Sequence, residues 1–145
     1  MTRNHGMQRG FTLIEIMVVV VIIGLLAAVV TQQLMGNVDN ARVSKAKQDI
    51  RQLETALTLY KLDNFRYPTT EQGLAALVQK PADPAVTHWK EGGYIKRVSK
   101  DPWGRDYQYE SPGTHGDLDL YTLGADGQPG GEKSDADIGN WNLDE

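Results

Sequence analysis

The sequence predicts an α+β protein in which one long N-terminal helix packs on a small antiparallel sheet. Residues 11–30 form an apolar run, and residues 31–62 continue it with helix-forming composition and an apolar stripe on one side. Two short segments after residue 100 alternate in the way that is typical of strands. We therefore expect a leader at 1–10, a membrane-spanning helical segment at 11–30 and one folded domain at 31–145.

The apolar run contains one charged residue, Glu15. As a helix that rises about 1.5 Å per residue, it is roughly 30 Å long, which is enough to cross the hydrocarbon core of a bilayer. Valine, isoleucine and leucine occupy all sides of this helix, so it is not the amphipathic helix of a soluble protein. A carboxylate in a bilayer costs about 3 kcal/mol unless it is paired or lies at headgroup level. Position alone leaves both interpretations of Glu15 open.

The leader has an unusual relation to the apolar run. Arg3 and Arg9 favour a cytoplasmic N-terminus, as in a signal peptide, but the small residue Gly10 lies before the apolar run and no convincing small-residue site follows it. The sequence Arg-Gly-Phe-Thr-Leu-Ile-Glu at 9–15 resembles the type III signal of the type IV pilin and pseudopilin superfamily. The resemblance implies that a prepilin peptidase cuts between Gly10 and Phe11 and methylates Phe11.

That resemblance also implies a role for Glu15, which is to meet the new amine at Phe11 of a neighbouring subunit as helices pack into a filament. A buried carboxylate with such a partner is stabilised, whereas an unpaired one is strongly penalised. The alternatives are an uncleaved anchor and a start of translation at Met7.

Composition bounds the partners of the folded domain. The net charge is −4 for the whole chain, and loss of the leader with its two arginines makes it more negative. An acidic domain argues against nucleic acid as a partner, since phosphate binding needs clustered lysine and arginine. The chain has no cysteine and therefore no disulfide bond. A small exported domain then needs another source of stability, such as a metal or oligomerisation.

The second half of the long helix has an apolar stripe at spacings of three and four residues, which predicts one buried side. A coiled-coil seam is the alternative, but the stripe is shorter than three heptads. No proline interrupts residues 30–36, so the sequence leaves open whether the helix bends or unwinds near Gly36 when it is packed in a filament. The stripe consists of Val43, Ala46, Ile50, Leu53, Leu57 and Tyr60.

The helix is expected to end near Asn64, which tolerates a left-handed conformation, and before Pro68. Thr69 and Gln72 then fit a capping box, which predicts a short helix from about residue 70 to residue 79. This helix is expected to bury Leu74, Leu77 and Val78.

Beyond residue 100, the residues Asp101 to Gly104 have the composition of a type I turn, and strands are predicted at 107–110 and 118–123. Tyr94 and Trp103 are interpreted as core residues rather than ligand-binding residues, and His115, in the loop between the strands, as solvated. Nothing here positions a nucleophile beside a base, so we expect no enzyme.

Three segments narrow the resemblance: 60–74, Gly-Gly-Tyr-Ile at 92–95, and Asp-Pro-Trp-Gly at 101–104. They look like the major pseudopilins of type II secretion systems. The resemblance implies a type IV pilin-like fold, a single-pass location in the inner membrane of a Gram-negative bacterium, and a domain in the periplasm. It also implies a homopolymer, the pseudopilus, that drives export of folded proteins. The implied partners are minor pseudopilins, the inner-membrane assembly platform and the outer-membrane secretin. A type IV pilus pilin for adhesion or motility is the alternative.

An acidic, glycine-rich loop follows the second predicted strand. Asp126, Glu132, Asp135 and Asp137 repel one another unless a cation neutralises them, and calcium suits loop carboxylates and carbonyls. The residues alone leave open a merely solvated loop, and the spacing is not that of an EF-hand.

The same resemblance implies that this loop binds one calcium ion, whose protein ligands we expect in a definite order. The carboxylates of Asp126 and Asp137 come first, followed by the backbone oxygens of Leu123 and Gln128 and then by Ser134 and Asp135. At family level, Lys96 and Arg97 are expected to pair with acids such as Glu54 on the next subunit.

Overall fold

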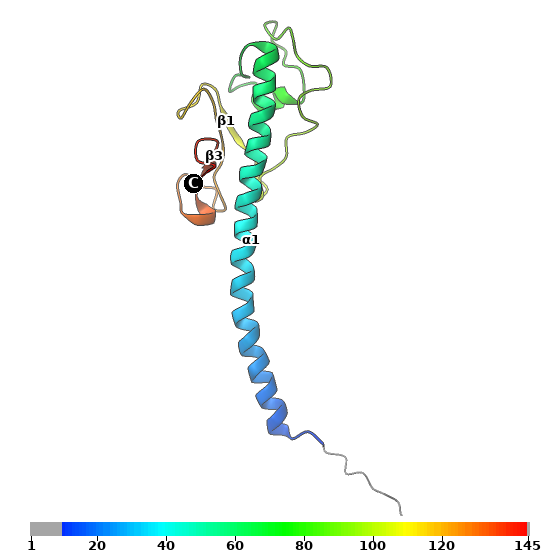
Figure 1. Cartoon of the computed structure of the whole chain (residues 1–145), viewed down its shortest axis with the longest axis vertical. Helices are drawn as coiled ribbons and strands as arrows, with labels where there is room; N and C mark the ends of the chain where they lie inside the picture. Colours follow the sequence, from blue (N-terminus) through cyan, green and yellow to red (C-terminus); the bar gives the residue numbers. More distant parts are fainter. Residues whose placement is uncertain (1–9, 145) are drawn as a thin grey trace, which may run out of the picture. The chain divides into compact units, whose positions relative to one another are not determined.

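The computed structural model describes residues 10–144, and for residues 31–35 the backbone alone. A long helix is followed by a short 3₁₀ helix, two strands, a second 3₁₀ helix and a third strand, so the predicted α+β class is confirmed (Figure 1). The elements are α1 (Leu13–Asn64), η1 (Leu74–Leu77), β1 (Gln108–Glu110), β2 (Asp119–Thr122), η2 (Lys133–Asp135) and β3 (Ile138–Gly139).

The chain divides into two compact units, Met1–Val38 and Asp39–Glu145, and α1 runs from the first into the second. In the first unit, α1 begins two residues after Phe11, and the part Leu13–Val30 is long and apolar enough to cross a membrane. Its large apolar side chains are between 46% and 80% exposed. In the single chain the helix is continuous through Gly36.

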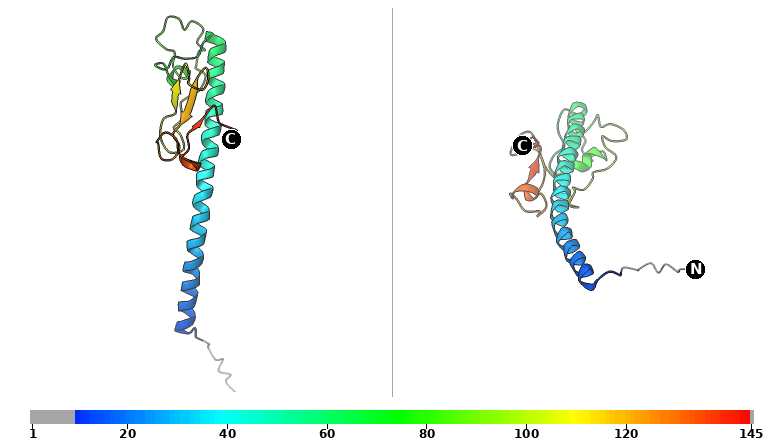
Figure 2. Two further views of the ribbon diagram at one scale, coloured as in Figure 1. Left: turned by 90° about the vertical axis from the view of Figure 1, so that its left-hand side faces the viewer. Right: turned by 60° about the horizontal axis from the view of Figure 1, so that its bottom comes forward.

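In the second unit, the predicted apolar stripe of α1 forms one wall of the core. Its members from Ala46 to Tyr60 are at most 7% exposed, and Val43 packs against them half-buried. The opposite wall comes from the loops and the sheet, through Leu77, Tyr107, Tyr109 and Leu120 among others. The stripe prediction is confirmed, and the sheet lies beside this part of α1 in both views of Figure 2.

The three strands form one antiparallel sheet in the order β1-β2-β3. Tyr109 pairs with Leu120, and Thr122 pairs with Ile138. The two predicted strands are confirmed with narrower bounds. The third strand was not predicted, because its two residues are too few to show alternation.

The helix α1 ends at Asn64, as predicted, but the left-handed residue is the next one along the chain. Phe65, not Asn64, has the left-handed conformation, with φ of 63°. The Asn64 amide is buried and donates to the Tyr60 carbonyl at 3.1 Å and to the Tyr94 hydroxyl at 3.0 Å. Asn64 therefore stays helical because its side chain is used to close the last turn against the core.

The predicted helix at 70–79 is also wrong in length and type. The capping box does form: Thr69 N–H donates to Gln72 Oε1 at 3.0 Å, and Gln72 N–H donates to Thr69 Oγ1 at 3.3 Å. Gly73, with φ of 56°, then takes the backbone out of the helical region. Only the 3₁₀ helix η1 follows; Leu74 and Leu77 are buried as predicted, but Val78 is half-buried.

Candidate functional site

The N-terminal end of α1 holds the residues predicted for processing and assembly. Gly10 and Phe11 are exposed, and Phe11 is 80% exposed. The leader residues before Gly10 lie outside the described part of the chain. Thr12 caps the helix: its hydroxyl accepts the Glu15 N–H at 3.3 Å, and its own N–H donates to Glu15 Oε2 at 3.5 Å.

The capping contact leaves the Glu15 carboxylate largely unsatisfied. The hydrogen bond that it accepts from Thr12 N–H is long, and no basic side chain within residues 10–144 forms an ion pair with it. The carboxylate is exposed among apolar neighbours. This end of the helix is thus equipped to accept a cation from outside the chain.

The second candidate site is the loop between β2 and β3, which has two arms. The first arm, residues 123–128, contains the predicted ligands Leu123, Asp126 and Gln128. In it, Gly127 N–H donates to the Leu123 carbonyl at 3.2 Å, and Gln128 N–H donates to Asp126 Oδ1 at 2.9 Å. Asp126 is exposed and turns back on its own arm.

The second arm, residues 130–137, contains the predicted ligands Ser134, Asp135 and Asp137. Asp137 Oδ2 accepts the N–H of Gly130 at 2.9 Å, but its other carboxylate oxygen, Oδ1, is buried and has no hydrogen-bond partner. The Ser134 carbonyl accepts the Ala125 N–H at 2.7 Å, which joins the two arms. Asp135 is exposed.

The residues present fit an oxygen-coordinated cation. Within residues 10–144, no three acidic or histidine side chains converge as a cage. The predicted ligand set, however, relies on carbonyls and a hydroxyl as much as on carboxylates. The buried, unpartnered oxygen of Asp137 is the kind of atom that a calcium ion satisfies. All six predicted ligands belong to residues 123–137, and the hydrogen bond between Ala125 and Ser134 joins the two arms of this loop.

Sequence reasoning missed Arg105, whose guanidinium reaches the first arm. It donates to the carbonyls of Gly124 and Ala125. The predicted type I turn before it is confirmed by the hydrogen bond from Gly104 N–H to the Asp101 carbonyl at 3.0 Å. Nothing in the sequence pairs residue 105 with residues 124–125, so only the fold reveals this contact.

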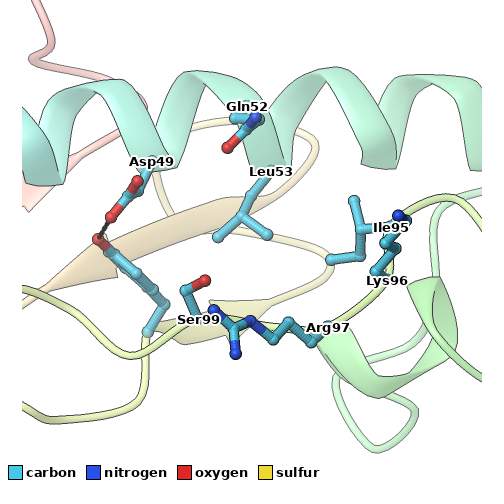
Figure 3. A pocket seen from close by; sticks show the side chains of 8 residues that line it. Asp49, Gln52, Leu53, Ile95, Lys96, Arg97 and Ser99 are labelled. Carbon is cyan, nitrogen blue, oxygen red and sulfur yellow. Dashed lines mark hydrogen bonds between the residues drawn. The ribbon is translucent and has the colours of Figure 1, made fainter.

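A pocket opens between α1 and the segment after η1, and Figure 3 shows the side chains that line it. Lys96 and Arg97 border it, and neither forms an ion pair within residues 10–144. Asp49, also on the border, accepts a hydrogen bond from the Tyr107 hydroxyl at 3.1 Å. Burial and the Asp49 charge raise the pKa of Tyr107 far above its usual value. The pocket therefore combines a satisfied acid with two unpaired cations.

His115 is exposed, as predicted, but its side chain also makes contacts within the chain. Its ring stacks on Trp141 with centroids 3.9 Å apart, and its Nδ1 lies 2.9 Å from Asp119 Oδ2. Asp119 is buried and also accepts the N–H groups of Thr114 and His115. Burial acts to raise the pKa of Asp119, but these hydrogen bonds outweigh it and hold that pKa below its usual value. The cluster fixes the β1–β2 loop.

Tyr94 and Trp103 are confirmed as core residues, because both pack half-buried against the main hydrophobic cluster. The Tyr94 hydroxyl also donates to Asp63 at 2.9 Å. Neither residue lines the pocket in Figure 3.

Comparison with known proteins gives consistent results. Residues 33–141 match the family described as "Type II secretion system (T2SS), protein G", and residues 5–31 match the "Prokaryotic N-terminal methylation motif". A Vibrio cholerae protein named type II secretion system core protein G is 62% identical over 136 residues, which cover 94% of this chain and 93% of that protein. Its Pseudomonas aeruginosa namesake is 59% identical over 135 residues, which cover 92% and 95%.

A solved structure is also similar. The major pseudopilin from the type 2 secretion system of enterohaemorrhagic Escherichia coli superposes with a TM-score of 0.65 at 50% sequence identity. The match covers 74% of this chain and 93% of that one.

Proposed function

Because the chain belongs to the protein G family of type II secretion systems, the major pseudopilins, we propose that its copies polymerise into a periplasmic pseudopilus that drives export of folded proteins across the outer membrane. One observation carries this proposal. The apolar helix of the first unit is exposed on all sides and contains a single carboxylate, Glu15, without a cationic partner within residues 10–144. Such a helix is stable only in a membrane or among other helices.

The comparisons favour this function over a type IV pilus subunit for adhesion or motility, since the relatives named are components of secretion systems. We propose a membrane-anchored subunit in the inner membrane of a Gram-negative bacterium, with its C-terminal domain in the periplasm. Its proposed partners are minor pseudopilins, the inner-membrane assembly platform and the outer-membrane secretin.

The subunit is proposed to be a substrate of an enzyme rather than an enzyme. A prepilin peptidase would cut between Gly10 and Phe11 and methylate the new amine. The match of residues 5–31 to the methylation motif and the exposure of Phe11 support this step. Intact-mass analysis of the protein from its host is expected to show loss of residues 1–10 and gain of one methyl group; a full-length mass would contradict it.

Assembly is tested by replacement of the lone charge. With Glu15→Gln, the carboxylate that attracts a neighbour's amine is lost, so we expect insertion in the membrane but a loss of filaments and of exported protein. Glu71→Gln, an exposed glutamate of the folded domain, is the matched control and should assemble normally. Sheared filaments and secreted protein are quantified from cells with equal membrane levels of each variant. Normal filaments with Glu15→Gln would overturn the role of Glu15.

Contacts between subunits are proposed at the pocket of Figure 3. Lys96 and Arg97 are exposed and unpaired, and a half-buried acid, Glu54, lines a separate pocket beside Trp141. We expect Glu54 of one copy to meet the two cations of another. Opposite-charge exchange, Glu54→Arg combined with Arg97→Glu, should restore filaments that each single change reduces. A double variant as poor as the singles would count against this pairing.

Calcium is proposed as the ligand of the loop between β2 and β3. The side chains of Asp126 and Asp137 and the carbonyls of Leu123 and Gln128 would hold it, with Ser134 and Asp135 completing the set. The cation would neutralise the carboxylates and order a glycine-rich segment whose residues each cost about 1–2 kcal/mol of backbone entropy to fix.

Thermal unfolding tests this proposal. A ligand at 100 times its dissociation constant stabilises the folded state by about 2.7 kcal/mol, so the midpoint should rise in calcium and fall in excess chelator. Magnesium, which demands a tighter octahedral site, should give a smaller shift. Asp137→Asn should abolish the calcium shift, whereas Asp144→Asn, at an exposed carboxylate outside the loop, should keep it. Equal midpoints in calcium and chelator would rule the site out.

A further inference from the structure

Arg105 reaches across from the turn that begins at Asp101 into the first arm of the loop. Its Nη2 donates to the Gly124 carbonyl, and its Nη1 lies 3.5 Å from the Ala125 carbonyl. A Cβ atom placed on Gly127 would lie 2.9 Å from Nη1 and 3.1 Å from Cζ. The guanidinium therefore covers the backbone on both sides of Asp126.

The backbone of Arg105 is itself held in place by Asp101. Asp101 has a fully buried side chain, and its Oδ1 accepts the N–H groups of Trp103 at 3.0 Å and Arg105 at 2.7 Å. Its Oδ2 accepts the Thr122 hydroxyl at 2.5 Å and lies 3.9 Å from Arg105 Nε. Asp101 thus ties the backbone of Arg105 to the last residue of β2, next to the start of the first arm.

These contacts matter most to the conformation of the arm. Gly124 and Gly127 both have positive φ, at 63° and 69°, and glycine at these positions leaves many alternatives open in a free loop. A planar guanidinium that donates to two successive carbonyls selects one conformation of the arm. It does so with more geometric specificity than a lysine ammonium has. These contacts therefore favour one conformation of the arm before a cation binds, and the cation would order the rest of the loop.

A positive charge beside a cation site also has a cost, namely repulsion. The Arg105 side chain is 39% exposed, so solvent screens its charge, and its guanidinium donates to carbonyls of residues outside the predicted ligand set. The gain from a pre-formed arm is not screened in this way. Pre-organisation is accordingly the larger effect.

We propose that Arg105 is a positioning residue that holds residues 123–128 in the conformation that binds calcium, an inference that rests on the calcium binding proposed above. It binds no metal itself. Through Gly124 and Ala125 it sets the direction of the neighbouring predicted ligands, Leu123 and Asp126.

Calcium titration by calorimetry on the full chain in detergent tests this proposal. If Arg105→Ala leaves the arm in its binding conformation about a tenth of the time, the dissociation constant rises about tenfold. Lys100→Ala is the charge-matched control, since Lys100 pairs with Asp106, which lies outside the loop; it should leave the constant unchanged. Arg105→Lys keeps the charge but not the fork, so a value between wild type and Arg105→Ala is expected.

Hydrogen exchange in excess chelator provides the second readout. Arg105→Ala should speed exchange of the amides in residues 123–128 while the amides of β1 and of α1 in the core keep wild-type rates, which also verifies that the variant is folded. If Arg105→Ala does not fold, Arg105→Lys carries the same comparison.

The outcomes separate this inference from the calcium proposal. No binding by the wild type would remove the calcium site and this inference with it. Binding by the wild type together with equal or tighter binding by Arg105→Ala would overturn the positioning role alone. If Arg105→Lys is indistinguishable from wild type in both readouts, the two hydrogen bonds to the Gly124 and Ala125 carbonyls are not what positions the arm.

Discussion

The helix α1 contains two regions whose apolar residues have opposite surroundings. Ile16, in the first unit, is 51% exposed, whereas Ile50, in the second, is fully buried against the sheet and loops. In the first region the apolar residues lie on all sides of the helix; in the second they form one stripe with charged residues around it. The same secondary structure is therefore stabilised from outside the chain in one region and from within it in the other.

This difference teaches how to assign residues to assembly and to folding. Burial of apolar surface contributes about 25 cal/mol per Å², wherever the covering atoms come from. The second unit covers its own stripe, while the first leaves its apolar surface for lipid or for other subunits. Substitutions in the first region should change membrane insertion and polymerisation, and those in the second should change the stability of the folded domain.

The largest predicted effect is a loss of stability in the second region. It is tested by an isoleucine-to-alanine substitution in each of the two regions. Ile50→Ala leaves a cavity in the core and should lower the free energy of unfolding of the domain by about 2–5 kcal/mol. Ile16→Ala should change it by less than about 0.5 kcal/mol, since no cavity forms in the domain. Thermal unfolding in detergent, followed by near-ultraviolet circular dichroism, measures both. Equal losses for the two variants would break the comparison.

A smaller effect is expected from the polar anchor in the second region, Asp119. Its pKa is held low in the folded state, so its contribution to stability is full above the pKa of the unfolded chain and is lost as pH falls through the folded-state value. Asp119→Ala should cost about 1–3 kcal/mol at pH 7, because its buried hydrogen-bond partners lose their acceptor.

The pH dependence is the sharper measurement of that anchor. The difference in unfolding free energy between wild type and Asp119→Ala should shrink as pH is lowered from 7 to 3, since protonation removes the charge-assisted part of the bonds. Asp144→Asn, which changes an exposed carboxylate, should track the wild type over that range. A difference that stays constant with pH would show that packing, not charge, anchors this loop.

Much of the fold was predictable from the sequence because periodicity records burial. The stripe from Val43 to Tyr60 and the strands around Tyr109 and Leu120 follow from spacing alone. The membrane segment and its lone Glu15 follow from composition. The predicted calcium ligands fall in one loop, but their choice came from family resemblance and stays a prediction.

The features that were missed depend on contacts distant in sequence or on single backbone angles. Arg105 is 20 residues from Ala125 in the sequence and contacts it only in the folded chain, and the two residues of β3 are recognisable only from their pairing with β2. Gly73 shortened a helix that its capping box favoured, since one residue with positive φ overrides good local capping. Such features have no periodic signal.

The smallest predicted effect on stability concerns Phe65, in the second region. Unlike the apolar stripe of that region, its side chain is 82% exposed, and its backbone has positive φ. A residue with a Cβ pays about 1–2 kcal/mol in this conformation, and glycine is the usual residue at such a helix end. The ring makes one edge contact, with His88 at 6.1 Å. Phe65→Gly should therefore stabilise the domain by about 1 kcal/mol after its own entropy cost. Phe65→Ala, which keeps the Cβ, should not stabilise it, and chemical denaturation compares the three proteins. If alanine stabilises as much as glycine, removal of the exposed ring rather than relief of backbone strain is the cause.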